Sequence, residues 1–151
     1  MPTPRLSIRE LTPEETVAFL DAQFVGRLAY TFRDRVDIVP VHYVHDGGWL
    51  YARTSFSPKL VVLEHHHWVA FEVDHVGDPW HWTSVVVRGT FHALDPDGPE
   101  SEREAHAHAV EVLRARFPGT LTDDDPVPHR RVLFRIHVDE ASGRAAALQH
   151  D

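Results

Sequence analysis

The sequence predicts a mainly β fold, a small antiparallel barrel with three peripheral helices. Six segments rich in apolar and β-branched residues are bounded by glycine, proline or short polar turns. Three other segments carry helix-capping residues or apolar residues at helical spacing. No internal repeat or low-complexity linker interrupts the 151 residues, which predicts one domain over 1–151. The predicted strands are residues 27–32, 36–44, 49–54, 68–76, 82–94 and 132–138.

The first predicted helix covers residues 11–24 and has a clear start signal. Thr12 is placed as N-cap, Pro13 follows at the first helical position, and Glu15 completes a T-x-x-E capping box. A second, short helix is expected to begin at Ser57-Pro58-Lys59, and a third over residues 100–117. Together they would cover the barrel from outside.

The predicted strand 36–44 has β-branched residues on both faces, which favours burial on both sides. Pro40 lies inside it and cannot donate to a ladder, so that point is an edge, a bulge or a ligand-facing position. Gly47 and Gly48 suit the positive φ angles of a hairpin turn, and Gly89 suggests a bend or bulge. Trp49 and Trp68 are predicted to be core residues.

Composition excludes several function classes. The net charge is −8 and the arginines are scattered, which argues against nucleic-acid binding. The absence of cysteine excludes disulfides, zinc ribbons and thiol catalysis. Since neither an apolar leader nor a membrane-length apolar run is present, we expect a cytoplasmic protein without a membrane partner.

Thirteen histidines raise the question of a metal site. Neighbouring helical residues are turned about 100° apart, so the run at residues 65–67 cannot direct all three rings at one ion. No H-E-x-x-H pattern is present. We therefore expect no metal site within one chain, while a histidine pair across a dimer axis stays open.

The polar step between the strand 49–54 and the second helix has the composition of a phosphate site. Hydroxyl donors, two cations and a helix N-terminus coincide within seven residues. Lys59 is the only lysine of the chain, and Ser57 is expected to cap the helix as well. The predicted phosphate-binding residues are Arg53, Thr54, Ser55, Ser57 and Lys59.

A set of short motifs then occurs in a specific order along nearly the whole chain. They are Leu11-Thr12 with Glu15, Val25 to Ala29, Val39-Pro40-Val41 with Tyr43-Val44, Tyr51 with Arg53-Thr54-Ser55 and Lys59-Leu60, Val69 to Asp74, Trp82 with Ser84 to Gly89, and Phe134-Arg135-Ile136 with Gly143-Arg144. In this order the chain resembles the flavin-binding split-barrel proteins related to pyridoxamine 5′-phosphate oxidase. The subgroup that it resembles includes the nitroimidazole-reductase-like resistance proteins.

The resemblance implies a six-stranded antiparallel split β-barrel that forms a homodimer, with FMN in clefts between subunits. The flavin phosphate would bind to Arg53, Thr54, Ser55, Ser57 and Lys59. Main-chain groups of Val39, Pro40 and Val41 would border the isoalloxazine edge, and Trp82 and Ser84 would approach from the partner. On this basis Arg53→Ala and Lys59→Ala are each expected to weaken FMN binding and leave the fold intact.

Two hypotheses about function follow. The first is an FMN-dependent oxidoreductase that reduces a small, flat, neutral substrate such as a nitroaromatic, with His42 as proton donor. For His42 alone, the alternative is a structural histidine of the barrel. The second hypothesis is a non-catalytic protein of the same fold that binds flavin, deazaflavin or haem.

Overall fold

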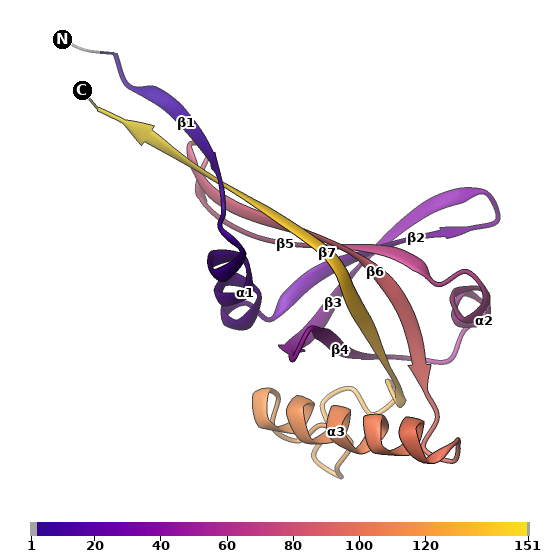
Figure 1. Cartoon of the computed structure of the whole chain (residues 1–151). Helices are drawn as coiled ribbons and strands as arrows, with labels where there is room; N and C mark the ends of the chain where they lie inside the picture. The colour runs from indigo at the N-terminus through magenta and orange to yellow at the C-terminus, as the bar shows by residue number, and fades with distance from the viewer. Residues whose placement is uncertain (1–2, 151) are drawn as a thin grey trace.

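The computed structural model describes residues 3–150, and within them the chain forms seven strands and three helices (Figure 1). The helices are α1 (Pro13–Ala22), α2 (Pro58–His65) and α3 (Glu100–Arg116). The strands are β1 (Arg5–Glu10), β2 (Val25–Phe32), β3 (Arg35–Asp46), β4 (Trp49–Thr54), β5 (Trp68–Asp78), β6 (His81–Leu94) and β7 (Val132–Gln149).

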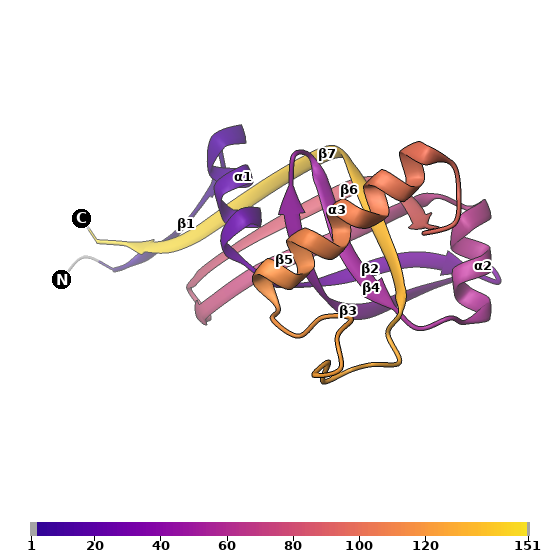
Figure 2. The same cartoon turned by 90° about the horizontal axis from the view of Figure 1, so that it is seen from below.

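All strand pairings are antiparallel, in the order β1-β7-β4-β3-β2-β5-β6. A further β6–β7 pairing closes six of these strands into a ring. This confirms the predicted mainly β, six-stranded antiparallel barrel with peripheral helices. Within the described residues, α1 and α2 lie at opposite ends of the barrel, and α3 lies across one side (Figures 1 and 2).

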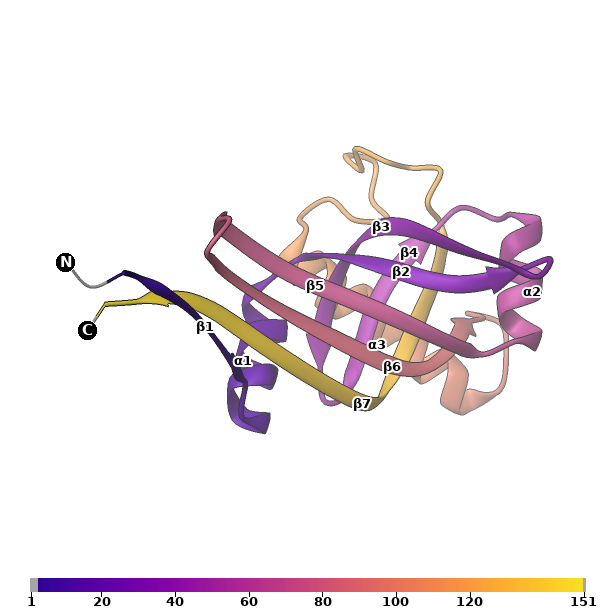
Figure 3. The ribbon, with the colours of Figure 1, turned by 90° about the horizontal axis from the view of Figure 1, so that it is seen from above.

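The structure adds one strand and lengthens another. β1 was not predicted, and β7 continues to Gln149 instead of ending at residue 138. The pairing of β1 with Arg144–Gln149 makes a ribbon that projects from the barrel (Figures 1 and 3). The second half of β7 contains Asp-Glu, Ser-Gly and alanines, which have low strand propensity, so its conformation depends on pairing with β6 and β1.

The local signals at Thr12, at the Gly47-Gly48 turn and at Gly89 are confirmed. The Thr12 hydroxyl accepts a hydrogen bond from the Glu15 N–H at 3.1 Å, and Glu15 accepts one from the Thr12 N–H at 3.0 Å. Hydrogen bonding from Arg9, more than from Thr12, lowers the pKa of Glu15 to about 2. Gly47 and Gly48 take φ angles of 58° and 82° in the hairpin turn. The strand register shifts at Gly89, as expected for a bulge.

The prediction that residues 36–44 are buried on both sides is wrong for this chain. β3 alternates, and its outward face exposes Val36 at 81% and Ile38 at 59%. Its inward residues Val39 and Val41 pack against the core, where Tyr43 is buried. Nothing within the described chain covers the outward apolar side chains, because the helices lie elsewhere on the barrel.

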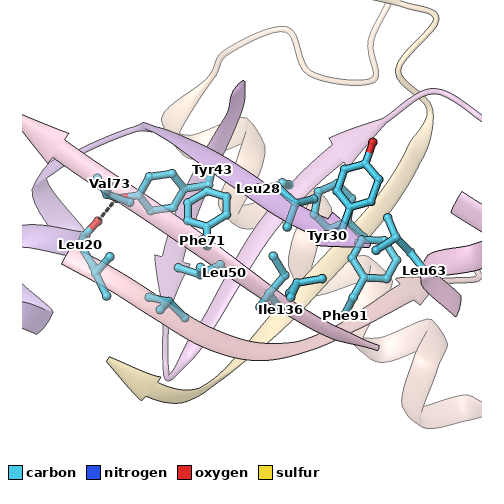
Figure 4. Close-up of a cluster of buried hydrophobic side chains, with 14 of the residues drawn as sticks. Leu20, Leu28, Tyr30, Tyr43, Leu50, Leu63, Phe71, Val73, Phe91 and Ile136 are labelled. Carbon is cyan, nitrogen blue, oxygen red and sulfur yellow. Dashed lines mark hydrogen bonds between the residues drawn. The ribbon is translucent and has the colours of Figure 1, made fainter. Parts of the chain in front are cut away.

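The core fills the barrel interior (Figure 4). Phe71 is 1% exposed, and its ring meets that of Tyr43 edge-on at 5.2 Å between centroids. The Tyr43 hydroxyl donates to the Leu20 carbonyl at 2.8 Å, which ties α1 to the core. Burial raises the pKa of Tyr43. Gly26 leaves room for the Phe71 ring, since a Cβ there would lie 2.1 Å from Phe71 Cε1.

The two tryptophans predicted to be core residues differ. Trp49 is half-buried against the cluster that joins α3 to the barrel, and the Arg135 guanidinium lies 3.7 Å from its ring centroid. For Trp68 the prediction is wrong, because its side chain is 75% exposed. Trp68 begins β5 on the outward side of the sheet, where alternation places it away from the core.

No helix in the part of the chain described here is long and apolar enough to cross a membrane.

Candidate cofactor site

A cavity of about 320 Å³ lies between α2, the inner face of the barrel and the loop that precedes β7. Its inner wall is apolar and its mouth is polar. Leu28, Tyr30, Leu60, Leu63, Phe91 and Phe134 form the wall, and the other lining residues are Val39, Pro40, Val41, Arg53, Thr54, Ser55, Ser57, Lys59, His129 and Arg130. The volume suits part of a small organic molecule with a polar end group.

Eight of the predicted cofactor-binding residues meet at this cavity, although they come from three elements and a loop. Two segments supply them: β3 gives the border residues, and the end of β4 with the start of α2 gives hydroxyls and cations. The eight are Val39, Pro40, Val41, Arg53, Thr54, Ser55, Ser57 and Lys59.

Arg53 is committed to an internal ion pair. Its Nη2 donates to Asp125 Oδ1 at 2.8 Å, and its Nη1 donates to the other carboxylate oxygen. The side chains are only 12% and 1% exposed. Asp125 also accepts from the backbone N–H groups of Leu121 and Val127, so it organises the loop before β7. The hydrogen bond from Arg53 is the main cause that holds the pKa of Asp125 well below its usual range.

Lys59 lies at the mouth with only part of its hydrogen-bonding capacity used. Its Nζ donates to Asp37 Oδ2 at 2.7 Å, and the Tyr30 hydroxyl donates to the same oxygen at 3.3 Å. The Lys59 contact is the largest cause that lowers the pKa of Asp37. An ammonium group has three donors, so Lys59 can hold an additional oxygen without leaving Asp37.

Ser57 occupies the N-cap position of α2, but its side chain makes no capping hydrogen bond. The prediction that the Ser57 side chain caps the helix is therefore wrong, although Ser57 holds the N-cap position, and among the described residues its hydroxyl makes no hydrogen bond. Pro58 is at the first helical position, where a backbone N–H would have no intrahelical partner in any case.

Sequence reasoning missed Arg130 and His129, which line the cavity from the loop before β7. Among the described residues Arg130 forms no ion pair, unlike Arg53 and Lys59. The only hint in the sequence was the pair Arg130-Arg131 just before a predicted strand. Such a pair does not differ from ordinary basic residues on the protein surface.

Three predicted residues do not line the cavity of their own chain. His42 is exposed on β3, with Phe117 and Phe24 rings at 5.4 Å and 6.2 Å. Trp82 and Ser84 lie on the outward side of β6, where the Ser84 hydroxyl donates to Glu72 Oε2 at 2.9 Å. Burial is the largest cause that raises the pKa of Glu72, followed by Asp74.

A larger cavity of about 790 Å³ lies near α1 and the β3–β4 turn. Its nearly buried His45 shares a hydrogen bond of 2.7 Å with Asp21. None of the predicted cofactor-binding residues line it. Between residues 3 and 150, no group of three histidine or acidic side chains has metal-binding geometry.

A model of the pyridoxamine 5′-phosphate oxidase family matches residues 12–145. The chain belongs to that family. Its ring of six strands with peripheral helices is the split barrel of pyridoxamine 5′-phosphate oxidase-like proteins.

Relatives span nearly the whole chain. An uncharacterized protein of Rhizobium meliloti is 27% identical over 147 residues, covering 92% of this chain and 95% of that protein. The crystal structure of a FAD-binding protein from Mesorhizobium loti has a TM-score of 0.72 at 28% identity, covering 91% and 97% of the two chains. A candidate 5-nitroimidazole antibiotic resistance protein from Bacteroides thetaiotaomicron shares the fold, with a TM-score of 0.67 at 14% identity over 98% and 95%.

Proposed function

We propose that this member of the pyridoxamine 5′-phosphate oxidase family is a flavoprotein that binds the FMN unit of a flavin at the cavity below α2. The observation that carries the proposal is the convergence of Lys59 and three hydroxyl groups on one cavity mouth. These groups are the donors that a phosphate needs, and Ser57 keeps its hydroxyl uncommitted. The apolar wall next to them suits the less polar part of a flavin.

The ion pairs at the cavity mouth indicate different roles for its three cations. Arg53 neutralises Asp125 and positions the loop, so Lys59 and Arg130 are the phosphate contacts that we propose. Arg53 acts through Asp125 as a positioning residue. Thr54 and Ser55 follow it at the end of β4, where they contribute hydroxyls.

We propose further that the active unit is a homodimer. Val36 and Ile38 on β3 are apolar and uncovered, and the projecting ribbon of β1 and β7 exposes Leu6 and Ile8. An isolated two-stranded ribbon is only marginally stable in water, and contacts with a partner subunit would stabilise it. Trp82 and Ser84 lie outside their own cavity, as expected if they complete the partner's flavin site.

The homodimer proposal predicts an assembly of twice the chain mass at low micromolar concentration in light scattering. Ile38→Asp should shift it to monomer, because a carboxylate would replace apolar surface at the interface. Ala107→Asp provides a control, since Ala107 is exposed on α3 and lies outside the proposed interface. A wild-type monomer at these concentrations would contradict the proposal.

For activity, we propose reduction of a small, flat, neutral molecule such as a nitroaromatic. A bound flavin supplies the hydride or electron transfer. Val39, Pro40 and Val41 border the position proposed for the flavin ring. The nearby cations are already engaged, because Arg53 pairs with Asp125 and Lys59 with Asp37, and Lys59 and Arg130 would contact the phosphate. An anionic substrate would lack a cation of its own.

Flavin titration tests the binding proposal. Lys59→Ala should raise the Kd for FMN by about ten- to a hundredfold, since a charge-assisted phosphate contact contributes roughly 1.5–3 kcal/mol. Quenching of flavin fluorescence measures it. Arg103→Ala removes an exposed arginine on α3 that does not line the cavity, so its Kd should match wild type. Equal affinities for all three proteins would exclude this phosphate site.

The copurified cofactor separates the remaining alternatives. Flavin absorption supports the proposal, whereas a Soret band would indicate haem and a blue-shifted chromophore a deazaflavin. Turnover of a nitroaromatic with a reduced nicotinamide donor would establish an oxidoreductase. Turnover of pyridoxamine 5′-phosphate instead would contradict the neutral-substrate proposal.

A further inference from the structure

The cavity of about 790 Å³ beside α1 lies between segments that are far apart in the sequence. The end of β1 with α1, the β3–β4 turn and the middle of β7 line it. It shares no lining residue with the cavity below α2. A ligand bound there would be held by groups that the proposed flavin site does not use.

Two backbone hydrogen bonds hold the walls of this cavity together. The Leu11 N–H donates to the Gly143 carbonyl at 2.9 Å, which joins the start of α1 to β7. The Val138 N–H donates to the Gly48 carbonyl at 3.0 Å, which joins β7 to the β3–β4 turn. The cavity is therefore pre-formed within the fold, as sites for small molecules usually are.

His45 lines the cavity with a side chain that is only 7% exposed. Its Nδ1 lies 2.7 Å from Asp21 Oδ1, and because an ionised carboxylate can only accept, Nδ1 carries the proton. Its Nε2 forms no hydrogen bond within residues 3–150 and is not fully buried. In the neutral imidazole Nε2 is an acceptor, so His45 leaves one acceptor open to a donor in the cavity.

Carboxylates outnumber cations in the lining. Three carboxylates and one guanidinium give an excess of two negative charges when the histidine is neutral, and these groups belong to Glu10, Asp21, Asp46 and Arg144. Asp21 and Asp46 each bond a histidine through one oxygen, and their side chains are 53% and 50% exposed. Their remaining oxygens can accept further hydrogen bonds. The lining therefore favours a cation and disfavours an anion.

The cavity also has an apolar wall. Val17 of α1 lines it and is 48% exposed, so its side chain is apolar surface that a ligand would remove from water. The other apolar lining residues are Leu11, Pro13, Leu20, Val138 and Ala141. Acceptors with excess negative charge and an apolar wall match an organic ammonium ion, which has N–H donors at one end and hydrocarbon at the other.

We propose that this cavity binds a small primary ammonium ion with an apolar body. The ammonium group would donate to Asp21 and to His45 Nε2, Glu10 would add negative charge, and the hydrocarbon part would cover Val17. The proposal assigns binding alone and does not depend on the proposed flavin function. A phosphorylated amine would bind poorly, since Arg144 is the single cation of the lining.

Titrations followed by amide chemical shifts in NMR test the proposal with three probes of similar shape. Benzylamine, benzyl alcohol and phenylacetate share a ring and differ in charge. Benzylamine should bind at least about tenfold more tightly than benzyl alcohol, since the alcohol lacks the charge-assisted hydrogen bonds, and phenylacetate should bind more weakly still. The shifts should occur in α1 and at Gly47 and Gly48. Equal affinities for amine and alcohol, or shifts elsewhere, would overturn the proposal.

Substitutions then identify the groups that hold the amine. Asp21→Asn should weaken benzylamine about tenfold, because the amide keeps an acceptor for His45 but loses the charge. Since Asp21 is half exposed, the variant should fold, which thermal denaturation checks. Glu14→Gln removes the same charge from an exposed position of α1 outside the cavity, so its Kd should match wild type.

Lys59→Ala separates this proposal from the proposed flavin function. It removes a proposed phosphate contact but should bind benzylamine as wild type does, because Lys59 does not line this cavity. Loss of flavin binding with unchanged amine binding supports the amine site. Benzylamine affinity in Asp21→Asn equal to that of wild type would overturn the amine site and leave the flavin proposal untouched.

Discussion

Phe71→Ala is expected to lower the free energy of unfolding by about 3–5 kcal/mol. Phe71 lies at the centre of the barrel core, where its ring packs edge-on against Tyr43 (Figure 4). The strands around it are joined in a closed ring and cannot collapse far into the space that the ring leaves. Chemical denaturation of variant and wild type measures the loss.

Gly26 provides a specific check on this prediction. In wild type, Gly26→Ala should also destabilise the fold, because its Cβ would lie 2.1 Å from Phe71 Cε1. In the Phe71→Ala background that overlap disappears, although the Glu72 carbonyl oxygen would still lie 3.0 Å from the new Cβ. The second substitution should then cost less than in wild type, giving a coupling of about 1 kcal/mol or more.

Gly77→Ala is the control, since a Cβ there would meet its nearest atom at an ordinary 3.4 Å. Strictly additive losses at positions 26 and 71 would show that Phe71 does not determine the need for glycine at position 26.

Arg53→Ala is the second substitution for which we expect a large effect. It should lower the melting temperature even when no flavin is present. The substitution leaves the Asp125 carboxylate, 1% exposed, without its cation. Removing one partner of a buried pair is costly, and we expect the melting temperature to fall by roughly 6 °C or more. Asp125→Asn added to Arg53→Ala should recover part of the loss, because it removes the unpaired charge. Thermal denaturation without flavin measures both.

The pH dependence of the same variant gives an independent measurement. Because the folded protein holds the pKa of Asp125 below its usual value, the ion pair contributes its full stability above the unfolded pKa of about 4. That contribution is lost as pH falls toward the lowered pKa. The melting temperatures of wild type and Arg53→Ala should therefore converge below about pH 4. A constant difference, or an Arg53→Ala variant as stable as wild type at pH 7, would contradict the structural role of Arg53.

Most of the barrel and half of the residues that line the candidate cofactor cavity could be predicted from short-range patterns. Strand alternation, the capping box at Thr12 and Glu15, and the glycine turn at Gly47 and Gly48 are decided within a few residues. The residues of the proposed phosphate segment could be singled out for the same reason, since its hydroxyls and Lys59 are close together in the chain. β1 and the end of β7 were not, because β1 is a strand only through pairing with β7, and the end of β7 only through pairing with β1 and β6.

The sequence by itself therefore determined the mainly β class and the order of the elements from α1 to β7, and it predicted a phosphate segment at residues 53–59. Only the tertiary structure decided which cations that segment can use. Arg53 and Asp125 are separated by 72 residues in the chain, yet their ion pair makes Arg53 a structural residue. Arg130 lines the cavity from the loop before β7. Which residues meet at the cavity depends on how strands distant in the sequence close the barrel. The role of a charged side chain therefore becomes clear only when its neighbours in the structure are known.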